Sequence, residues 1–187
     1  DAHYFQGLTD EDHGKTLLPY RERFHYISLS PELIEEILGE CIANFKKRNS
    51  DVNLKVTIPD EPLMVNVDAM LIEQVLINLM ENAVQHGKTT TRIELRLSSA
   101  GGLAVFEVAD NGCGIEKELL PHLFDGYLTR DQEEISDQRR NMGIGLSVCM
   151  SIVQAHGGTM RARTRKKGGA LLQFTLPLEE NSHEHQR

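Results

Sequence analysis

Cysteine and long apolar stretches are both scarce in this sequence, and their scarcity excludes several classes of protein. The chain has 3 cysteines among 187 residues. They are far apart and odd in number, so they show neither a metal-ligand spacing nor a disulfide framework. Free cysteines fit a reducing compartment, so we expect a cytoplasmic location. No apolar run reaches about 18 residues and no signal peptide opens the chain, so we expect a soluble piece, which is compatible with its excision from a longer membrane protein.

Positive charge is also in short supply. The sequence has 20 Lys and Arg against 28 Asp and Glu, a formal net charge of −8, whereas a nucleic-acid-binding domain would carry a basic face. The one basic cluster spans residues 161–167, where alternating arginines precede a Lys-Lys-Gly-Gly turn, and we interpret it as an exposed strand and hairpin tip. The length and the 40% hydrophobic content predict one ordinary domain with a substantial core.

A P-loop for phosphate binding is absent, although two short stretches resemble its end. Residues 14–16 read Gly-Lys-Thr, but Thr9 stands where the first glycine is required and no strand precedes it. Residues 87–89 also read Gly-Lys-Thr, but Asn82 stands at the glycine position and the segment ends a helix instead of starting one. A nucleotide site in this chain would therefore have to be built differently.

The pattern over residues 68–86 predicts a helix with two distinct faces, capped at its start by Asp68 and ended by Gly87. One face is apolar, and the other consists almost wholly of amides and carboxylates instead of the Lys–Glu pairs typical of a solvated face. Amide and carboxylate oxygens suit a hard cation such as Mg²⁺. A polar surface face explains the same pattern, so this helix alone leaves both interpretations open. The apolar face comprises Ile72, Val75, Leu76, Leu79 and Ala83, and the polar face comprises Gln74, Asn78, Glu81, Asn82 and Gln85.

The rest of the chain mixes helices with strands in a pattern typical of an α+β layer. We expect a mixed, mostly antiparallel sheet with three main helices packed on one face. Ser30 and Pro31 predict the start of a helix that reaches about residue 47, and a third helix begins after residues 143–145 and reaches about residue 156. Strands are expected at residues 24–28, 53–58, 62–66, 91–99, 103–110, 159–164 and 170–176, with a short helical segment at 116–124. Residues 1–29 then form a linker, 30–178 the domain, and 179–187 a disordered tail.

Two glycine-rich loops flank a polar segment, residues 125–142, which has no apolar period and which we interpret as a mobile functional loop. In residues 110–114, Asp110 ends a buried strand and could accept a hydrogen bond from an exocyclic amine such as that of adenine, although a plain turn explains the same residues. Residues 143–146 are expected to open a helix whose free N–H groups suit an anion, with a flexible hinge as the alternative. Neither loop completes G-x-G-x-x-G, which excludes a Rossmann or protein serine/threonine kinase fold.

Four segments, in order, resemble the conserved boxes of the GHKL ATPase superfamily. Residues 78–86 (Asn-Leu-Met-Glu-Asn-Ala-Val-Gln-His) are similar to the N box, and residues 110–114 (Asp-Asn-Gly-Cys-Gly) to the G1 box. Residues 124–127 (Phe-Asp-Gly-Tyr) are similar to the F box, and residues 143–146 (Gly-Ile-Gly-Leu) to the G2 box. Asn78, where other branches have Glu, resembles sensor histidine kinases, and the segments around 71–83 and 142–149 look most like the potassium-responsive ones.

The resemblance, which covers about residues 30–178, implies a Bergerat-type two-layer α/β sandwich that binds Mg-ATP. It implies Asn82 on Mg²⁺ with support from Asn78, Asp110 as the reader of the adenine amine, and residues 125–142 as the ATP lid. Glu81 would orient or deprotonate an accepting imidazole, so Glu81 and Asn82 are the catalytic candidates. Gly112 and Gly114 would give the base room, and Gly143 and Gly145 would meet the phosphates. The other nucleotide-binding candidates are Gln85, His86, Lys88, Ile115, Phe124, Tyr127, Arg140, Ile144 and Leu146.

Departures from the family pattern affect the phosphate end and the acceptor. Gln85 stands where the family often has Lys, so Lys88 or the arginines at 130, 139 and 140 would have to supply the missing cation. Asn141 replaces a frequent glycine, which makes a stiffer lid hinge. No histidine carries the acidic-then-Pro pattern of the family's phosphoacceptor, so the acceptor helices lie outside this chain.

The resemblance therefore implies a catalytic domain that works with partners. These are the protein's own dimerisation and phosphoacceptor domain and a cognate response regulator, within a homodimer anchored in the bacterial membrane. Two alternatives stay open. One is a nucleotide-dependent binding module without phosphotransfer, and the other is a different GHKL ATPase or a serine kinase.

Overall fold

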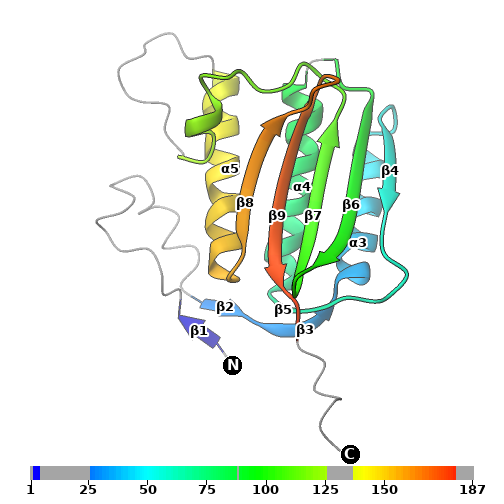
Figure 1. Ribbon diagram of the computed structural model, residues 1–187, viewed down its shortest axis with the longest axis vertical. Coiled ribbons are helices and arrows are strands. Elements are labelled where there is room, and N and C mark those ends of the chain that lie inside the picture. The colour runs from blue at the N-terminus through cyan, green and yellow to red at the C-terminus, as the bar shows by residue number, and fades with distance from the viewer. Residues whose placement is uncertain (1, 5–25, 88, 126–136, 180–187) are drawn as a thin grey trace, which may run out of the picture.

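A five-stranded sheet covered on one face by three helices forms the body of the protein (Figure 1). The computed structural model describes residues 2–4, 26–87, 89–125 and 137–179. The helices are α3 (Ile34–Arg48), α4 (Ala69–His86) and α5 (Asp137–Ala155). The strands of the sheet lie in the order β4 (Asn53–Thr57), β6 (Arg92–Ala100), β7 (Leu103–Asp110), β9 (Ala170–Pro177) and β8 (Thr159–Thr164).

The sheet is mixed and mostly antiparallel, as expected. Strands β6 and β7 pair through the tight turn after Ala100, strand β9 pairs with β7, and strand β8 pairs with β9, all antiparallel. Strand β4 joins the edge of β6 in parallel. The predicted α+β sandwich, with the helices on one face, is therefore confirmed.

The core lies between the helices and the covered face of the sheet. Alternate residues of the central strands point into it, as the burial of Ile93, Leu95 and Leu97 on β6 shows. Phe106 of β7 and Phe174 of β9 lie directly opposite each other, and their rings stack with centroids 4.3 Å apart. The five predicted apolar residues of α4 are all buried against this layer, with exposed fractions of at most 6%.

Helix α4 begins and ends where the sequence predicts. The carboxylate of Asp68 accepts a hydrogen bond from the backbone N–H of Leu71 at 3.3 Å, which caps the helix start. The helix runs to His86, with Gly87 as its C-cap. It therefore carries its polar face from the lower end of the sandwich in Figure 1 to the upper end, where β7 also ends.

The predicted helix start at Ser30 is wrong. Residues Ser30–Leu33 form strand β3, which pairs antiparallel with β5 (Met64–Val67), and α3 begins only at Ile34. The local signals of a serine cap followed by proline were overridden by strand pairing with a segment more than 30 residues away. Proline is tolerated in β3 because this two-stranded sheet has free edges.

The third helix also differs from expectation, because α5 begins at Asp137, nearly two turns before the predicted start at residue 143. Residues 138–140 are Gln-Arg-Arg, which are good helix formers and extend the helix toward the N-terminus. Its C-terminal end agrees with the sequence, since the N–H of Gly158 donates to the carbonyl of Val153 and that of Gly157 to the carbonyl of Gln154.

The remaining segments are short. Residues 116–124 contain one 3-10 turn, η3 (Leu120–His122), where a short helical segment was expected. Within the expected linker, β1 (Ala2–Tyr4) pairs with β2 (Tyr26–Ser28), so a strand predicted near 24–28 is confirmed at Tyr26–Ser28. None of the helices in the described part of the chain is long and apolar enough to cross a membrane.

Candidate nucleotide-binding site

The polar face of α4 contacts both neighbouring helices, through Asn78 to α5 and through Glu81 to α3. Asn82 lies in the last-but-one turn of the helix, and its side-chain Nδ2 is buried without a hydrogen-bond partner among the described residues. Asn78, one turn earlier, donates from Nδ2 to the thiol of Cys149 on α5 at 3.6 Å. Burial raises the pKa of this thiol to about 12, so Cys149 stays protonated and the contact is a weak neutral bond.

The orphaned amide of Asn82 fits a metal or phosphate ligand. An asparagine side chain presents either its oxygen or its nitrogen to one place by turning its amide plane by 180°. A buried polar group without a partner costs free energy that a bound ligand would recover. No group of three or more His, Cys, Asp or Glu side chains gathers in the described residues, so an ion held here would rest on amide oxygens, phosphates and water.

Glu81 lies on the same helix but has its partner elsewhere. Its carboxylate forms an ion pair with Arg48 of α3, with 3.4 Å between Nη1 and Oε1. This pair is substantially exposed, so its contribution to stability is small. The predicted role of Glu81 toward an accepting imidazole stays a prediction.

Asp110 ends strand β7 and is almost fully buried, with 6% of its surface exposed. Its Oδ1 accepts hydrogen bonds from the backbone N–H groups of Gly112, at 2.8 Å, and Ala170, at 3.3 Å. Both bonds use the same oxygen, and in the described part of the chain the other carboxylate oxygen, Oδ2, has no donor. A carboxylate held by one oxygen presents the second as a directed acceptor, as recognition of an exocyclic amine requires.

The loop after Asp110 packs directly against the end of α4. The N–H of Cys113 donates to the carbonyl of Gly87 at 3.1 Å, and its thiol donates to the carbonyl of His86 at 3.5 Å. A Cβ at Gly112 would lie 2.5 Å from the oxygen of Gly87, so only glycine fits this approach. The structure thus joins the loop at 110–114 to the helix end that carries Asn82, although the two are separate in the sequence.

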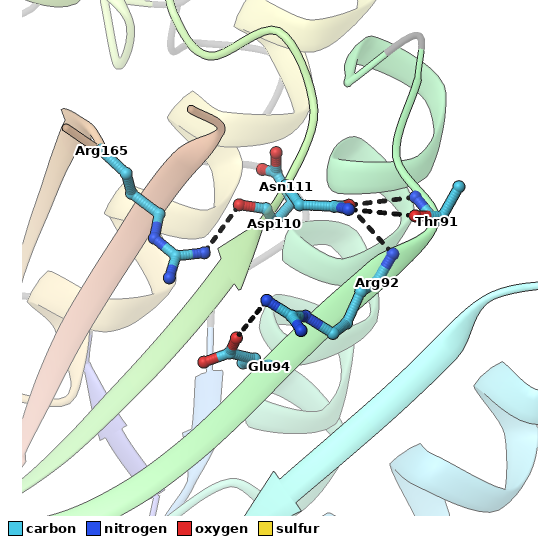
Figure 2. A network of polar contacts seen from close by, with 6 residues as sticks. All are labelled: Thr91, Arg92, Glu94, Asp110, Asn111 and Arg165. Atoms are coloured by element: carbon cyan, nitrogen blue, oxygen red, sulfur yellow. Dashed lines mark hydrogen bonds and ion pairs between the residues drawn. The ribbon is translucent and has the colours of Figure 1, made fainter. Parts of the chain in front are cut away.

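A second anchor holds the loop to strand β6 (Figure 2). The side-chain oxygen of Asn111 accepts from the backbone N–H groups of Thr91 and Arg92, each at 3.0 Å, and its Nδ2 donates to the hydroxyl of Thr91 at 3.0 Å. Three bonds from one side chain hold the start of β6 and the end of β7 together. Sequence reasoning treated Asn111 only as part of a turn motif and missed this role.

In the described part of the chain, burial affects two histidines, His86 and His156. Burial lowers the pKa of the half-buried His86, which lies at the end of α4. The buried His156 has a lowered pKa for the same reason, but it lies at the opposite end of α4. There its Nε2 accepts from the backbone N–H of Asp68 at 3.0 Å. His86 is thus the histidine that accompanies the site.

The other predicted site residues are placed as follows. Gln85 is exposed, Ile115 and Phe124 are half-buried against the core, and Leu146 is a core residue with 1% exposure. Lys88 and Tyr127 lie outside the described residues, and most of the expected lid lies in the undescribed span 126–136. Five of these residues fall within α5, namely Arg140, Gly143, Ile144, Gly145 and Leu146.

The helix start predicted at Gly143 and Gly145 is wrong, whereas the role of these two glycines toward the phosphates stays a prediction. Both lie inside α5, beyond the first four N–H groups that a helix leaves free. The free N–H groups of α5 belong instead to the turn that begins at Asp137. A side chain at Gly145 would meet nothing within 4 Å, so space is open beside this position.

Comparison with known proteins assigns the chain to a family. Residues 67–180 match the family described as "Histidine kinase-, DNA gyrase B-, and HSP90-like ATPase", a match that covers more than half of the chain. The chain belongs to this ATPase family. The matched region contains α4 with Asn82, the Asp110 loop and α5, which are the elements that the GHKL resemblance singled out.

Within the family, the chain is similar in sequence to sensor kinases. Sensor protein KdpD of Clostridium acetobutylicum is 40% identical over 148 residues, which are 79% of this chain and 16% of that protein. Sensor protein KdpD of Escherichia coli is 33% identical over 145 residues, 77% of this chain and 16% of that protein. The expected similarity to the potassium-responsive sensor kinases is therefore confirmed, and the chain spans about one sixth of the length of these two relatives.

Solved structures show the same fold. The catalytic domain of histidine kinase ThkA matches with a TM-score of 0.66 at 24% identity, covering 80% of this chain and 95% of that one. Mycobacterial sensor histidine kinase MprB matches with a TM-score of 0.65 at 22% identity, covering 81% and 98%. Because both sequence identities are below 25%, the likeness to these structures supports the fold of the domain and nothing further.

Proposed function

We propose that this chain is the ATP-binding catalytic domain of a two-component sensor histidine kinase. In this function it transfers the γ-phosphoryl group of ATP to a histidine on a dimerisation domain outside the chain. The observation that carries the proposal is that the loop after Asp110 packs on the end of α4, the helix that carries Asn82. Among the described residues, the buried Nδ2 of Asn82 has no hydrogen-bond partner, and the hydrogen bonds to the Asp110 carboxylate all use Oδ1. The family match supports ATP as the nucleotide, and the similarity to sensor kinases supports a histidine as the phosphoryl acceptor.

In this site Asp110 accepts a hydrogen bond from the adenine amine, and Gly112 and Gly114 allow the base to lie close to the backbone. Asn82, with Asn78 one turn earlier on α4, would hold Mg²⁺ at the phosphate end, and the ion would neutralise phosphate charge. Residues 125–142 keep the role of ATP lid that the resemblance implies, and the last six of them form the start of α5. The chain's own contribution is chiefly positioning and exclusion of water.

The reaction is an in-line displacement. An imidazole nitrogen of the acceptor forms a bond to the γ-phosphorus while the bond from that phosphorus to the bridging oxygen breaks, and ADP leaves with the electron pair. The imidazole gives its N–H proton to a base, for which Glu81 is the candidate on α4. In the free domain Oε1 of Glu81 is paired with Arg48, so an accepting imidazole would compete with the arginine for this carboxylate.

The proposed partners follow from the same assignment. The acceptor domain belongs to the same protein, and a response regulator receives the phosphoryl group from it. A solved complex of histidine kinase ThkA with response regulator protein TrrA has a TM-score of 0.68 to this chain at 24% identity, covering 88% of this chain and 46% of that one. We place the domain on the cytoplasmic side of a membrane-anchored homodimer.

The direct test measures Mg-ATP affinity and phosphotransfer in an Asn82→Ala variant. The domain is mixed with Mg-ATP and the dimerisation helices of its parent protein, and acid-labile phosphate on histidine is measured. We expect the native chain to transfer and Asn82→Ala to lose transfer, with ATP affinity reduced about tenfold or more because a charge-assisted contact is lost. Gln74→Ala, an exposed amide on the same helix face, is the matched control and keeps both.

Two results would change the proposal. Unchanged affinity and transfer in Asn82→Ala would show that the metal assignment is wrong. Tight ATP binding without any transfer to the acceptor helices would favour the nucleotide-dependent binding module instead.

A further inference from the structure

The turn between β8 and β9 is hydrogen-bonded to the backbone of Asp110, although Arg165 of this turn lies 55 residues after Asp110 in the sequence. Arg165, the first residue after β8, donates from Nη1 to the carbonyl oxygen of Asp110 at 2.8 Å (Figure 2). Its side chain is half-buried, whereas the neighbouring basic residues Arg163, Lys166 and Lys167 are exposed. The basic cluster that the sequence indicates as a solvated hairpin tip therefore contains one arginine with a specific partner.

The conformation of the turn packs its backbone closely against Asp110. Gly169 has a φ of +85°, a conformation that other residues rarely adopt, and a Cβ on it would collide with the carbonyl oxygen of Asp110. The next residue, Ala170, donates its backbone N–H to Asp110 Oδ1. The turn itself is closed by bonds between Arg165 and Gly169 and between Gly168 and Arg165. Asp110 is thus contacted on both its main chain and its side chain by one turn.

A second pair of hydrogen bonds joins Thr164, the last residue of β8, to Ile115 at the end of the loop. The backbone N–H of Ile115 donates to the hydroxyl of Thr164 at 3.2 Å, and that hydroxyl donates to the carbonyl of Ile115 at 2.8 Å. The turn therefore holds the loop at both of its ends, at Asp110 and at Ile115. Of these contacts, that of Arg165 is made by an ionised donor and is expected to be the strongest.

We propose that Arg165 is a positioning residue for adenine recognition and helps to set the preference for adenine nucleotides. The bond to the carbonyl oxygen fixes the peptide plane between Asp110 and Asn111, and the two N–H bonds to Oδ1 fix the side chain. Together they direct Oδ2 toward one place before any nucleotide binds, which removes an ordering cost from recognition. The inference rests on the proposed function, in which Asp110 reads the adenine amine.

The test compares two nucleotides that differ only in the group that Asp110 reads. Binding of ATP and of purine riboside triphosphate, which lacks the exocyclic amine, is measured by calorimetry with the native chain and with Arg165→Ala. We expect Arg165→Ala to weaken the binding of ATP about tenfold and the binding of purine riboside triphosphate less than twofold. The reason is that the substitution disturbs only the acceptor that the exocyclic amine of ATP uses. Arg163→Ala removes the same charge from an exposed position on β8 and leaves both affinities unchanged.

Other outcomes would overturn the inference. An equal loss of affinity for both nucleotides would make Arg165 a structural or phosphate-binding residue, and unchanged ATP affinity would remove its role. If Arg165→Ala does not fold, Arg165→Gln supplies the same comparison, because it keeps most of the aliphatic stem but loses the ionised donor.

Asp110→Asn separates this inference from the proposal beneath it. If Asp110→Asn retains the native preference for ATP over purine riboside triphosphate, the assignment of Asp110 to the adenine amine fails. If Asp110→Asn loses the preference but Arg165→Ala keeps it, the assignment of Asp110 stands and the positioning role of Arg165 fails alone.

Discussion

Substitution of Gly112 by alanine tests how tightly the Asp110 loop must pack on the end of α4. A Cβ at this position would lie 2.5 Å from the carbonyl oxygen of Gly87 and 2.7 Å from its Cα. It would also lie 2.6 Å from the hydroxyl oxygen of Thr90. Two of these neighbours are backbone atoms, so a side-chain rotation cannot relieve the clash. Either the end of α4 or the loop must move.

The structure allows the size of the effect to be estimated. An unstrained contact between carbon and oxygen needs about 3.3 Å, so the overlap with the Gly87 oxygen is roughly 0.8 Å. Such overpacking costs about 1–3 kcal/mol. A loss of 2 kcal/mol lowers the melting temperature of a domain of this size by about 4–8 °C. Because the displaced loop begins at Asp110, the hydrogen bond between Asp110 and the adenine base would also be lost. This loss would weaken ATP binding roughly ten- to hundredfold.

The assay combines thermal unfolding followed by circular dichroism with ATP titration by calorimetry. Gly39→Ala is the matched control, since Gly39 lies exposed within α3 and a Cβ there meets nothing within 4 Å. This control is expected to raise stability by about 0.5–1 kcal/mol, because alanine favours a helix more than glycine does. A Gly112→Ala variant with native stability and native ATP affinity would refute the close approach on which the site geometry depends.

Two further predictions concern the rest of the domain. Burial lowers the pKa of His156 from its ordinary 6.5, so the unfolded chain takes up the proton first. Stability is then full above about pH 6.5 and falls as the pH drops below it, a loss that thermal unfolding between pH 7.5 and 5.5 should show and that should be smaller in His156→Gln. Phe174→Ala removes a fully buried ring stacked on Phe106 and should cost about 3–5 kcal/mol in urea unfolding, whereas Leu103→Ala, at an exposed position, should cost less than about 0.5 kcal/mol.

Features that depend on neighbouring residues were predictable from the sequence. The start of α4 at Asp68, its apolar stripe and its end at Gly87 all follow from capping and from a 3.6-residue period within one stretch of chain. The β6–β7 and β8–β9 hairpins follow from alternation around glycine turns. The motif order also predicted the family, because each box is a short contiguous segment.

Features that depend on distant partners were not predictable in this way. Residues Ser30–Leu33 became a strand only because β5 offers a partner, and the start of α5 was misplaced because two glycines outweighed the helix formers before them. Glu81 lies on the expected face of α4, yet its partner Arg48 comes from another helix. Nothing near Arg165 in the sequence indicates its bond to Asp110.

The sequence by itself therefore determined the fold class, the family and the residues Asn82 and Asp110 as candidates for the site. The tertiary structure decided which side chains meet: Asn111 with the start of β6, the Gly112 loop with the end of α4, and Arg165 with Asp110. The physical reason is range. Periodicity, caps and turns are properties of a few consecutive residues, whereas a hydrogen-bond partner is chosen by how whole elements pack against one another.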